Sequence, residues 1–168
     1  MKIFWDTFLL RSSRVRWHTI TTMYKYFKII LYVMRLRVVS SKEEIPVLNT
    51  NEQMIHLAFR PSNMDVMTLI QRCPRVRAVQ TPPSYYRTMS KAARQFLEIQ
   101  GVELLRGDVW GHRKDIDEYY EIDEGVIGRL SQLMSEGRKI DEIITLVKRE
   151  TTLSEDLIKY ILKTSVMI

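Results

Sequence analysis

The sequence predicts an α/β fold, in which a four-stranded, mainly parallel βα unit is followed by a three-helix, helix-turn-helix-like unit. Four short β-branched or aliphatic runs support the first part: residues 36–39, 54–59, 76–80 and 102–105. Helix signals rather than hairpin turns separate these runs, which indicates right-handed βαβ crossovers and a parallel sheet. Three short helical patterns near the C-terminus support the second part. A curved stack of βα units is the alternative to an open sheet.

The first two segments between the runs carry signals for the start and the end of a helix. Ser41 and Glu44 form a capping-box pattern, and Pro46 keeps any helix there short. Ser62 precedes an apolar run at helical spacing that stops at Pro74. Each segment is therefore expected to form a helix that returns the chain to the start of the next strand.

The third segment between the runs predicts one long helix, from about residue 84 to residue 100. Gly101 is placed where a helix C-terminus favours glycine. The face of this helix that is expected to be buried holds Met89, Ala92, Ala93, Phe96 and Leu97.

The C-terminal part reads as a separate unit, so we expect an α/β domain over residues 34–121 and a three-helix unit over residues 122–168. Leu153 and Ile158 bracket Ser154 as a hydrophobic staple, which defines the start of the last helix. A short turn separates the last two helices, as is typical of a helix-turn-helix unit.

Nearly all of the net positive charge lies in the first 33 residues. The chain has 168 residues and a formal charge of +6, from 26 Lys and Arg against 20 Asp and Glu. Residues 1–33 hold six basic residues, one acid and eight of the 16 aromatic residues, so they supply +5 and the rest of the chain only +1. The nucleic-acid or membrane partner that a basic chain suggests is therefore not indicated for the main body.

Several interpretations of residues 1–33 compete. Lys25 and Lys28 interrupt the best apolar stretch, so no transmembrane segment is expected. No small-residue cleavage site follows an apolar run, so a signal peptide fits poorly. A basic aromatic helix lying on an anionic membrane is a third interpretation. We favour a fourth, in which these residues are not native and the natural chain starts at Met34.

The composition excludes several classes of protein. Hydrophobic residues make up 45% of the chain and charged residues 27%, which is typical of a folded domain and not of a disordered or collagen-like chain. Cys73 is the single cysteine, which excludes a disulfide scaffold. Three His without paired ligand spacing predict no metal site, and the lack of a glycine-rich phosphate loop disfavours a nucleotide cofactor. We therefore expect no cofactor.

The loops after the strands are the predicted ligand site, because ligands of parallel sheets bind at the carboxyl ends of the strands. Arg60 beside a helix that starts at Ser62 suits an anion such as phosphate or carboxylate. We expect a small anionic ligand, with the following candidate residues: Arg60, Ser62, Asn63, Ser84, Tyr85, Arg113 and Lys114. The alternative is that Ser62 only caps its helix and that Arg60 pairs with a surface acid.

The segment GDVWGHRKDIDEYY, residues 107–120, is the densest cluster of polar side chains. Asp108 and His112 are candidates for an acid–base pair, with the two basic residues that follow as electrostatic stabilisers. The alternative is a tight loop in which Trp110 covers the sheet edge. His56, in the middle of a predicted strand, is interpreted as a satisfied buried imidazole rather than a ligand.

The three-helix unit is a candidate for binding DNA or protein. Helix-turn-helix proteins usually read DNA with the first residues of the last helix, and here these are Glu155 and Asp156, whose charge is unfavourable. The candidates for nucleic-acid contact are Lys148, Arg149, Lys159 and Lys163. Residues 122–168 hold seven basic and eight acidic residues, a net charge of −1. The alternative is a helical bundle that packs on the sheet or on another subunit of a homo-oligomer.

Two blocks of opposite charge lie in the main body. Residues 72–94 hold six basic residues and no acid, and residues 115–124 hold six acids and no base. The basic block includes Tyr85 and Tyr86, so in isolation it is similar to a nucleic-acid surface with stacking aromatic rings. The alternative is that the two blocks pair with each other in space.

Four stretches together resemble a domain-of-unknown-function family found in methanogenic archaea: LRVVSSKEEI, HLAFRPSN, SYYRTMSK and, above all, GDVWGHRKDIDEYY. The resemblance covers about residues 34–168 and leaves residues 1–33 outside. It implies a reduced, cytoplasmic, archaeal protein. It implies no catalytic residue, because the family has no established activity.

The leading hypothesis is a non-enzymatic regulatory or adaptor protein, in which the α/β domain binds a small anion and the helical unit contacts DNA or protein. The rival hypothesis is a small enzyme that acts on a phosphorylated or carboxylate substrate, with Asp108 and His112 as its acid–base pair. A structural or oligomerisation role is the third hypothesis.

Overall fold

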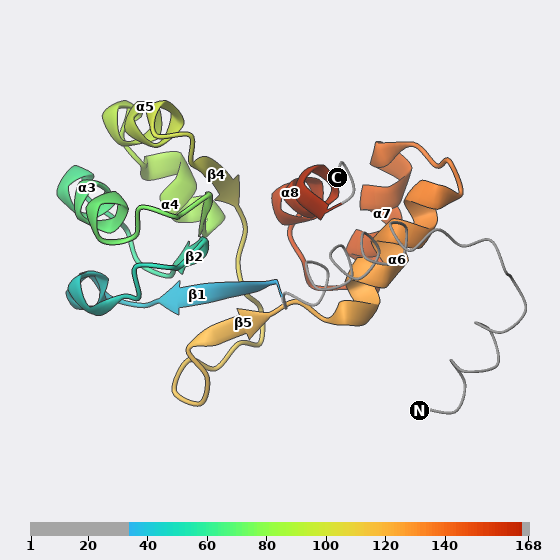
Figure 1. The fold of residues 1–168 in the computed structure, drawn as a ribbon, viewed down its shortest axis with the longest axis horizontal. Helices are drawn as coiled ribbons and strands as arrows, with labels where there is room; N and C mark the ends of the chain where they lie inside the picture. The colour runs from blue at the N-terminus through green and yellow to red at the C-terminus, as the bar shows by residue number, and fades with distance from the viewer. Residues whose placement is uncertain (1–33, 166–168) are drawn as a thin grey trace, which may run out of the picture. The chain divides into compact units, whose positions relative to one another are not determined.

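The computed structural model describes residues 34–165, so the extension assigned above to residues 1–33 lies outside the described residues. Four parallel strands form the centre of the fold: β1 (Arg35–Val39), β2 (Met54–Leu57), β3 (Ala78–Thr81) and β4 (Glu103–Arg106). They lie in the order β4-β3-β2-β1 (Figure 1). The predicted parallel βα unit is therefore confirmed.

A fifth strand, β5 (Tyr119–Glu121), pairs antiparallel with β1 at one edge of the sheet. The sequence analysis missed β5, because three residues inside an acidic run show no alternation of apolar and polar side chains. Since β4 forms the opposite edge, residues 107–118 carry the chain from one edge of the sheet to the other.

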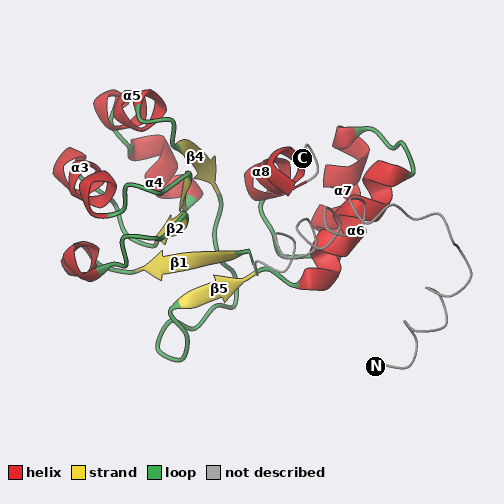
Figure 2. Ribbon diagram, in the orientation of Figure 1, coloured by secondary structure: helices red, strands yellow, loops and turns green. Residues whose placement is uncertain are grey.

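Helices η1 (Lys42–Val47), α3 (Asn63–Arg72), α4 (Pro83–Thr88) and α5 (Lys91–Ile99) connect the parallel strands (Figure 2). The capping box that the sequence predicts at Ser41 and Glu44 is present, and Pro46 lies inside the short 3-10 helix η1. Helix α3 starts after Ser62 and ends before Cys73, as predicted.

The single helix predicted from residue 84 to residue 100 is wrong, because the chain forms α4 and α5 instead. Met89 adopts an extended backbone with φ −63° and ψ 135°, and the Ser90 hydroxyl accepts a hydrogen bond from the Ala93 N–H at 3.0 Å. A serine that caps a helix competes with a continuous helix at the same position. The structure buries Met89, Ala93 and Leu97 of the predicted buried face, whereas Ala92 is exposed.

Helices α6 (Glu124–Ser135), α7 (Ile140–Glu150) and α8 (Glu155–Ser165) pack on the other face of the sheet. Successive strand residues point to opposite faces, so each strand contributes to two cores. Leu36, Met54, Ala78 and Leu105 join the core with α6–α8, and Val39, Ile55, Leu57 and Val79 join the core with η1, α3 and α5. The two parts predicted from the sequence thus share a hydrophobic core.

The last two helices form the predicted helix-turn-helix arrangement. A four-residue turn, residues 151–154, joins α7 to α8. The Ser154 hydroxyl accepts a hydrogen bond from the Leu157 N–H at 3.3 Å, and both Leu153 and Ile158 are buried, as the predicted staple requires. Among the helices of residues 34–165, none is long and apolar enough to cross a membrane.

Replacing Ser90 by alanine should lower the free energy of unfolding by about 1 kcal/mol, because the first turn of α5 loses its N-cap. Urea unfolding followed by circular dichroism measures this change. Ser84→Ala, at an exposed position inside α4, is the matched control and should change the stability by less than about 0.5 kcal/mol. Equal effects of the two substitutions would contradict this account of the helix break.

Candidate functional site

A buried polar centre lies at the carboxyl ends of β2 and β3, on the face that carries α6–α8. His56 and Gln80 are neighbours in the register of the two strands and are 0% and 1% exposed. The Nδ1 of His56 lies 3.0 Å from Oε1 of Gln80. The two polar side chains therefore share one hydrogen bond inside an otherwise apolar sheet face.

The same glutamine ties the sheet to the start of α8. Its Nε2 donates a hydrogen bond to the Ser154 hydroxyl at 3.0 Å. Because the Gln80 amide N–H is used by Ser154, its carbonyl oxygen faces His56, which assigns the imidazole proton to Nδ1. A second hydrogen bond supports this junction, since the Arg106 N–H donates to Asp156 Oδ2 at 2.8 Å.

Gly107 is required at this junction by its close surroundings. A Cβ atom on Gly107 would fall on the side-chain ends of Ser154 and Gln80, closer than real Cβ contacts come. Glycine therefore allows the chain leaving β4 to pass directly beside the cap of α8.

Asp108 faces His56 and not His112. Its Oδ1 lies 3.6 Å from Nε2 of His56 and accepts a hydrogen bond from the Val109 N–H at 2.9 Å. Burial lowers the pKa of His56, while the hydrogen bond to Gln80 and the charge of Asp108 oppose this shift. The imidazole is therefore neutral at pH 7, and its Nε2 has no hydrogen-bond partner among the described residues.

The structure does not join the predicted pair Asp108 and His112. The His112 ring packs edge-on against Tyr120, with centroids 5.8 Å apart, and no hydrogen bond or ion pair within residues 34–165 links it to Asp108. The sequence analysis missed the grouping of His56 with Gln80. The predicted runs, residues 54–59 and 76–80, put His56 at the third position and Gln80 at the fifth, so they gave no signal for this register.

The two basic residues predicted beside that pair point to separate partners. Arg113 makes a two-pronged ion pair with Asp115, at 3.2 and 2.5 Å. Lys114 contacts Glu44, whose carboxylate also accepts from the N–H groups at the start of η1. These two contacts anchor the loop between β4 and β5, and the structure does not bring the two basic side chains to a common pocket.

The predicted anion site, in the loops that follow β2 and β3, lies at the start of α3. There the Asp65 carboxylate accepts hydrogen bonds from the N–H and the hydroxyl of Ser62, at 2.8 and 2.7 Å. Asn63 accepts a hydrogen bond from Ser90 at 2.6 Å. A carboxylate of the chain thus already occupies the helix start. Arg60 is exposed and forms no ion pair with an acidic residue within residues 34–165. Ligand binding by Arg60, Ser84 and Tyr85 remains a prediction.

The two charged blocks do not pair with each other. Within residues 34–165 no ion pair joins residues 72–94 to residues 115–124. Arg37 forms an ion pair with Glu118 at 3.0 Å. The Arg94 guanidinium lies over the Tyr86 ring, with its Cζ 4.8 Å from the ring centroid. The alternative in which the two blocks pair with each other in space is therefore wrong, and two acids of the acidic block pair with Arg37 and Arg113 instead.

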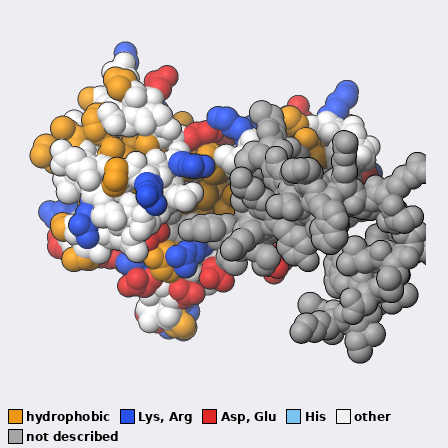
Figure 3. Space-filling view, viewed as in Figure 1, with side chains coloured by type: hydrophobic (Ala, Val, Ile, Leu, Met, Phe, Trp, Pro, Cys, Tyr) orange, Lys and Arg blue, Asp and Glu red, His pale blue; other side chains and the backbone are white. Residues whose placement is uncertain are grey.

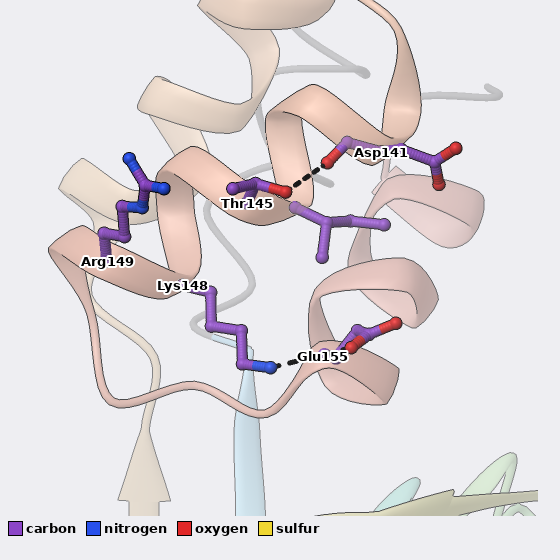
Figure 4. A pocket seen from close by; sticks show the side chains of 6 residues that line it. Asp141, Thr145, Lys148, Arg149 and Glu155 are labelled. Atoms are coloured by element: carbon purple, nitrogen blue, oxygen red, sulfur yellow. Dashed lines mark hydrogen bonds and ion pairs between the residues drawn. The ribbon is translucent and has the colours of Figure 1, made fainter.

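Two of the predicted nucleic-acid residues, Lys148 and Lys159, lie beside Glu155 at the start of α8, and Lys163 lies in its last turn. Lys148 and Lys159 both pair with Glu155, at 3.6 and 2.8 Å, and Lys163 pairs with Glu103 at 2.8 Å. The hydrogen bond from Lys159 lowers the pKa of Glu155. A hollow of about 460 Å³ is lined by residues of α7 and α8, among them Ile144, Lys148 and Arg149. Figure 4 shows Lys148 directed toward Glu155.

The described part of the chain holds no group of three or more His, Cys, Asp or Glu that could bind a metal ion. Within the polar centre, His56 is fully buried and has no nucleophile beside it. The arrangement is suited to fixing the start of α8 against the sheet.

Two family descriptions match the chain. Residues 35–118 match "Family of unknown function (DUF1699) N-terminal domain", and residues 125–163 match "Protein of unknown function (DUF1699) C-terminal HTH domain". No curated protein and no solved structure matches the chain.

Gly107→Ala should lower the free energy of unfolding by about 1–3 kcal/mol, because the added methyl group overpacks the junction of Ser154 and Gln80. Chemical unfolding measures this loss. Gly128→Ala is the control, because Gly128 lies within α6 and has open space around it; there alanine should stabilise by about 0.5–1 kcal/mol. A neutral effect of Gly107→Ala would show that the junction is not closely packed.

The stability should fall as the pH drops below 6.5, the ordinary pKa of His. The unfolded chain binds a proton there, while the folded state resists it because the pKa of His56 is lowered. The stability is thus full above this pH and declines by at most about 1.4 kcal/mol per pH unit until the folded pKa is reached.

Urea unfolding at pH 7.5, 6.5 and 5.5 measures this dependence. His56→Gln should remove it, and Asp108→Asn should enlarge the loss, because the favourable charge beside the imidazolium is gone. An unchanged pH profile in His56→Gln would assign the dependence to other groups.

Proposed function

Because the chain belongs to the DUF1699 family, whose function is unknown and whose C-terminal domain is described as a helix-turn-helix, we propose that it is a non-enzymatic regulatory protein that contacts DNA phosphates through α8. The observation that supports this is the α7–turn–α8 arrangement, in which Lys159 and Lys163 occupy the exposed side of the second helix. The archaeal origin and the cytoplasmic location remain predictions from the resemblance.

The acids at the start of α8 are less unfavourable than the sequence suggests, because the protein itself engages both. Glu155 pairs with Lys148 and Lys159, and Asp156 accepts from a backbone N–H. Phosphate groups would then compete with carboxylates for the same ammonium groups. We therefore expect weak binding that depends strongly on salt.

Burial of α8 limits what it can read. Helices that read base edges use several exposed side chains in the major groove, but Leu157 and Tyr160 are 1% and 5% exposed. Among the described side chains of α8, only Lys159 and Lys163 are exposed and Glu155 is half-buried, so the accessible side of the helix is a narrow stripe. Such a narrow stripe suits contacts with the phosphate backbone, which position a protein but carry no sequence information.

A regulatory role fits the way in which α8 is attached. Its first turn is tied to the strand ends by the hydrogen bonds from Gln80 to Ser154 and from Arg106 to Asp156. A ligand that altered the strand ends would shift the helix that carries the two lysines. The buried centre thereby supports a link between the two domains.

Lys159→Ala with Lys163→Ala should weaken binding of the full chain to a 20-base-pair duplex, measured by fluorescence anisotropy at 50 and 200 mM salt. Loss of two phosphate contacts should lower the slope of log affinity against log salt by about 2. The matched control is Lys42→Ala with Lys91→Ala, which removes two exposed lysines of the α/β domain.

Two results would contradict this proposal. One is the absence of salt-dependent binding at 100 μM protein. The other is an equal loss in the control, which would assign the DNA contact to general charge, including the six basic residues of the N-terminal 33.

A further inference from the structure

Within residues 34–165, no strand pairs with the outer side of the β5 backbone. In an antiparallel ladder, alternate residues direct their main-chain groups toward the neighbouring strand. The groups of Glu118 and Ile122 bond to β1, so those of Tyr119 and Glu121 point outward. The Tyr119 N–H is used by Asp117 Oδ1 at 3.0 Å. The N–H of Glu121 and the two carbonyl oxygens remain directed away from the sheet.

An aromatic hollow of about 450 Å³ lies beside this edge. Its lining includes Trp110, Ile116, Tyr119 and Tyr120, contributed by β5 and the loop that precedes it. Trp110 is 70% and Ile116 is 75% exposed. Large apolar side chains that are exposed next to an unpaired strand edge are typical of an interaction surface.

The charge of the hollow is negative. The carboxylates of Asp117 and Glu121 line it and make no ion pair within the described part of the chain, while its basic residue, Arg113, is paired with Asp115. Figure 3 shows acidic side chains gathered around β5 and the loop before it. Arg35, the cross-strand neighbour of Glu121, stacks on the Tyr119 ring at 4.0 Å, so a ring of this hollow already accepts a cation.

From these observations we infer that the outer edge of β5 docks an extended, basic segment of a partner protein. The segment adds a strand through the main-chain groups of Tyr119 and Glu121. Its lysine or arginine side chains lie against Trp110 and Tyr120, close to Asp117 and Glu121. This surface lies apart from the α8 lysines, so the inference is independent of the proposed DNA contact.

The test is calorimetric titration of the full chain with an eight-residue peptide that alternates lysine and valine. The control peptide alternates glutamate and valine. Binding of the basic peptide alone, weakened at higher salt, is expected. Trp110→Ala and the double variant Asp117→Asn with Glu121→Gln should each lower the affinity at least about tenfold.

Matched variants separate this surface from general effects. Ile99→Ala removes another exposed apolar side chain, which is 79% exposed at the end of α5, and Glu142→Gln removes an exposed acid of α7. Both should bind the basic peptide as the unmodified chain does. Equal losses in these controls, or equal binding of the acidic peptide, would overturn the inference.

The backbone contact is tested separately at Glu121. Proline there removes the outward N–H and leaves the ladder with β1 intact, since proline is tolerated on an edge strand. Glu121→Pro should bind the peptide more weakly than Glu121→Gln, with both variants checked for folding by circular dichroism. Equal affinities would exclude strand addition. A self-association that Trp110→Ala abolishes would assign the edge to a second copy of the chain.

Discussion

Helix α8 is packed along two sides, against β4 and against α7, and the arrangement of the C-terminal half depends on this double burial. Leu157, Ile158 and Ile161 are each at most 1% exposed. An amphipathic helix of an ordinary helix-turn-helix unit buries one side and presents the other to its partner. Here the sheet covers much of the second side, so the unit that is described as a helix-turn-helix domain is also one layer of the α/β core.

The polar centre makes this packing specific. Hydrophobic contacts alone allow a helix to slide or rotate on a sheet, because they have little directionality. His56, Gln80 and Ser154 form a buried chain of hydrogen bonds that is satisfied only when the cap of α8 meets the end of β3. Gly107 leaves the space for that approach. These buried polar residues thus have an architectural role at this junction.

The electrostatic character of the protein follows from local placement rather than from the total charge of +6. The basic block at residues 72–94 and the acidic block at residues 115–124 stay separate in the folded chain. Around α8, lysines and carboxylates neutralise one another in close pairs. Around β5, Asp117 and Glu121 make no such pair within the described residues, whereas Glu118 and Asp115 do. The two surfaces therefore differ in the charge that they leave unpaired.

The sequence by itself determined the four parallel strands, most helix boundaries and the helix-turn-helix unit, because these depend on local periodicity and on capping residues such as Ser62 and Ser154. It did not determine β5 or the break at Ser90, where short segments carry weak local signals. Which polar side chains of the buried centre contact each other was decided only by the tertiary structure. Gln80 lies beside His56 because the parallel strands β2 and β3 bring residues far apart in the chain into register, a relation that spacing along the sequence does not contain.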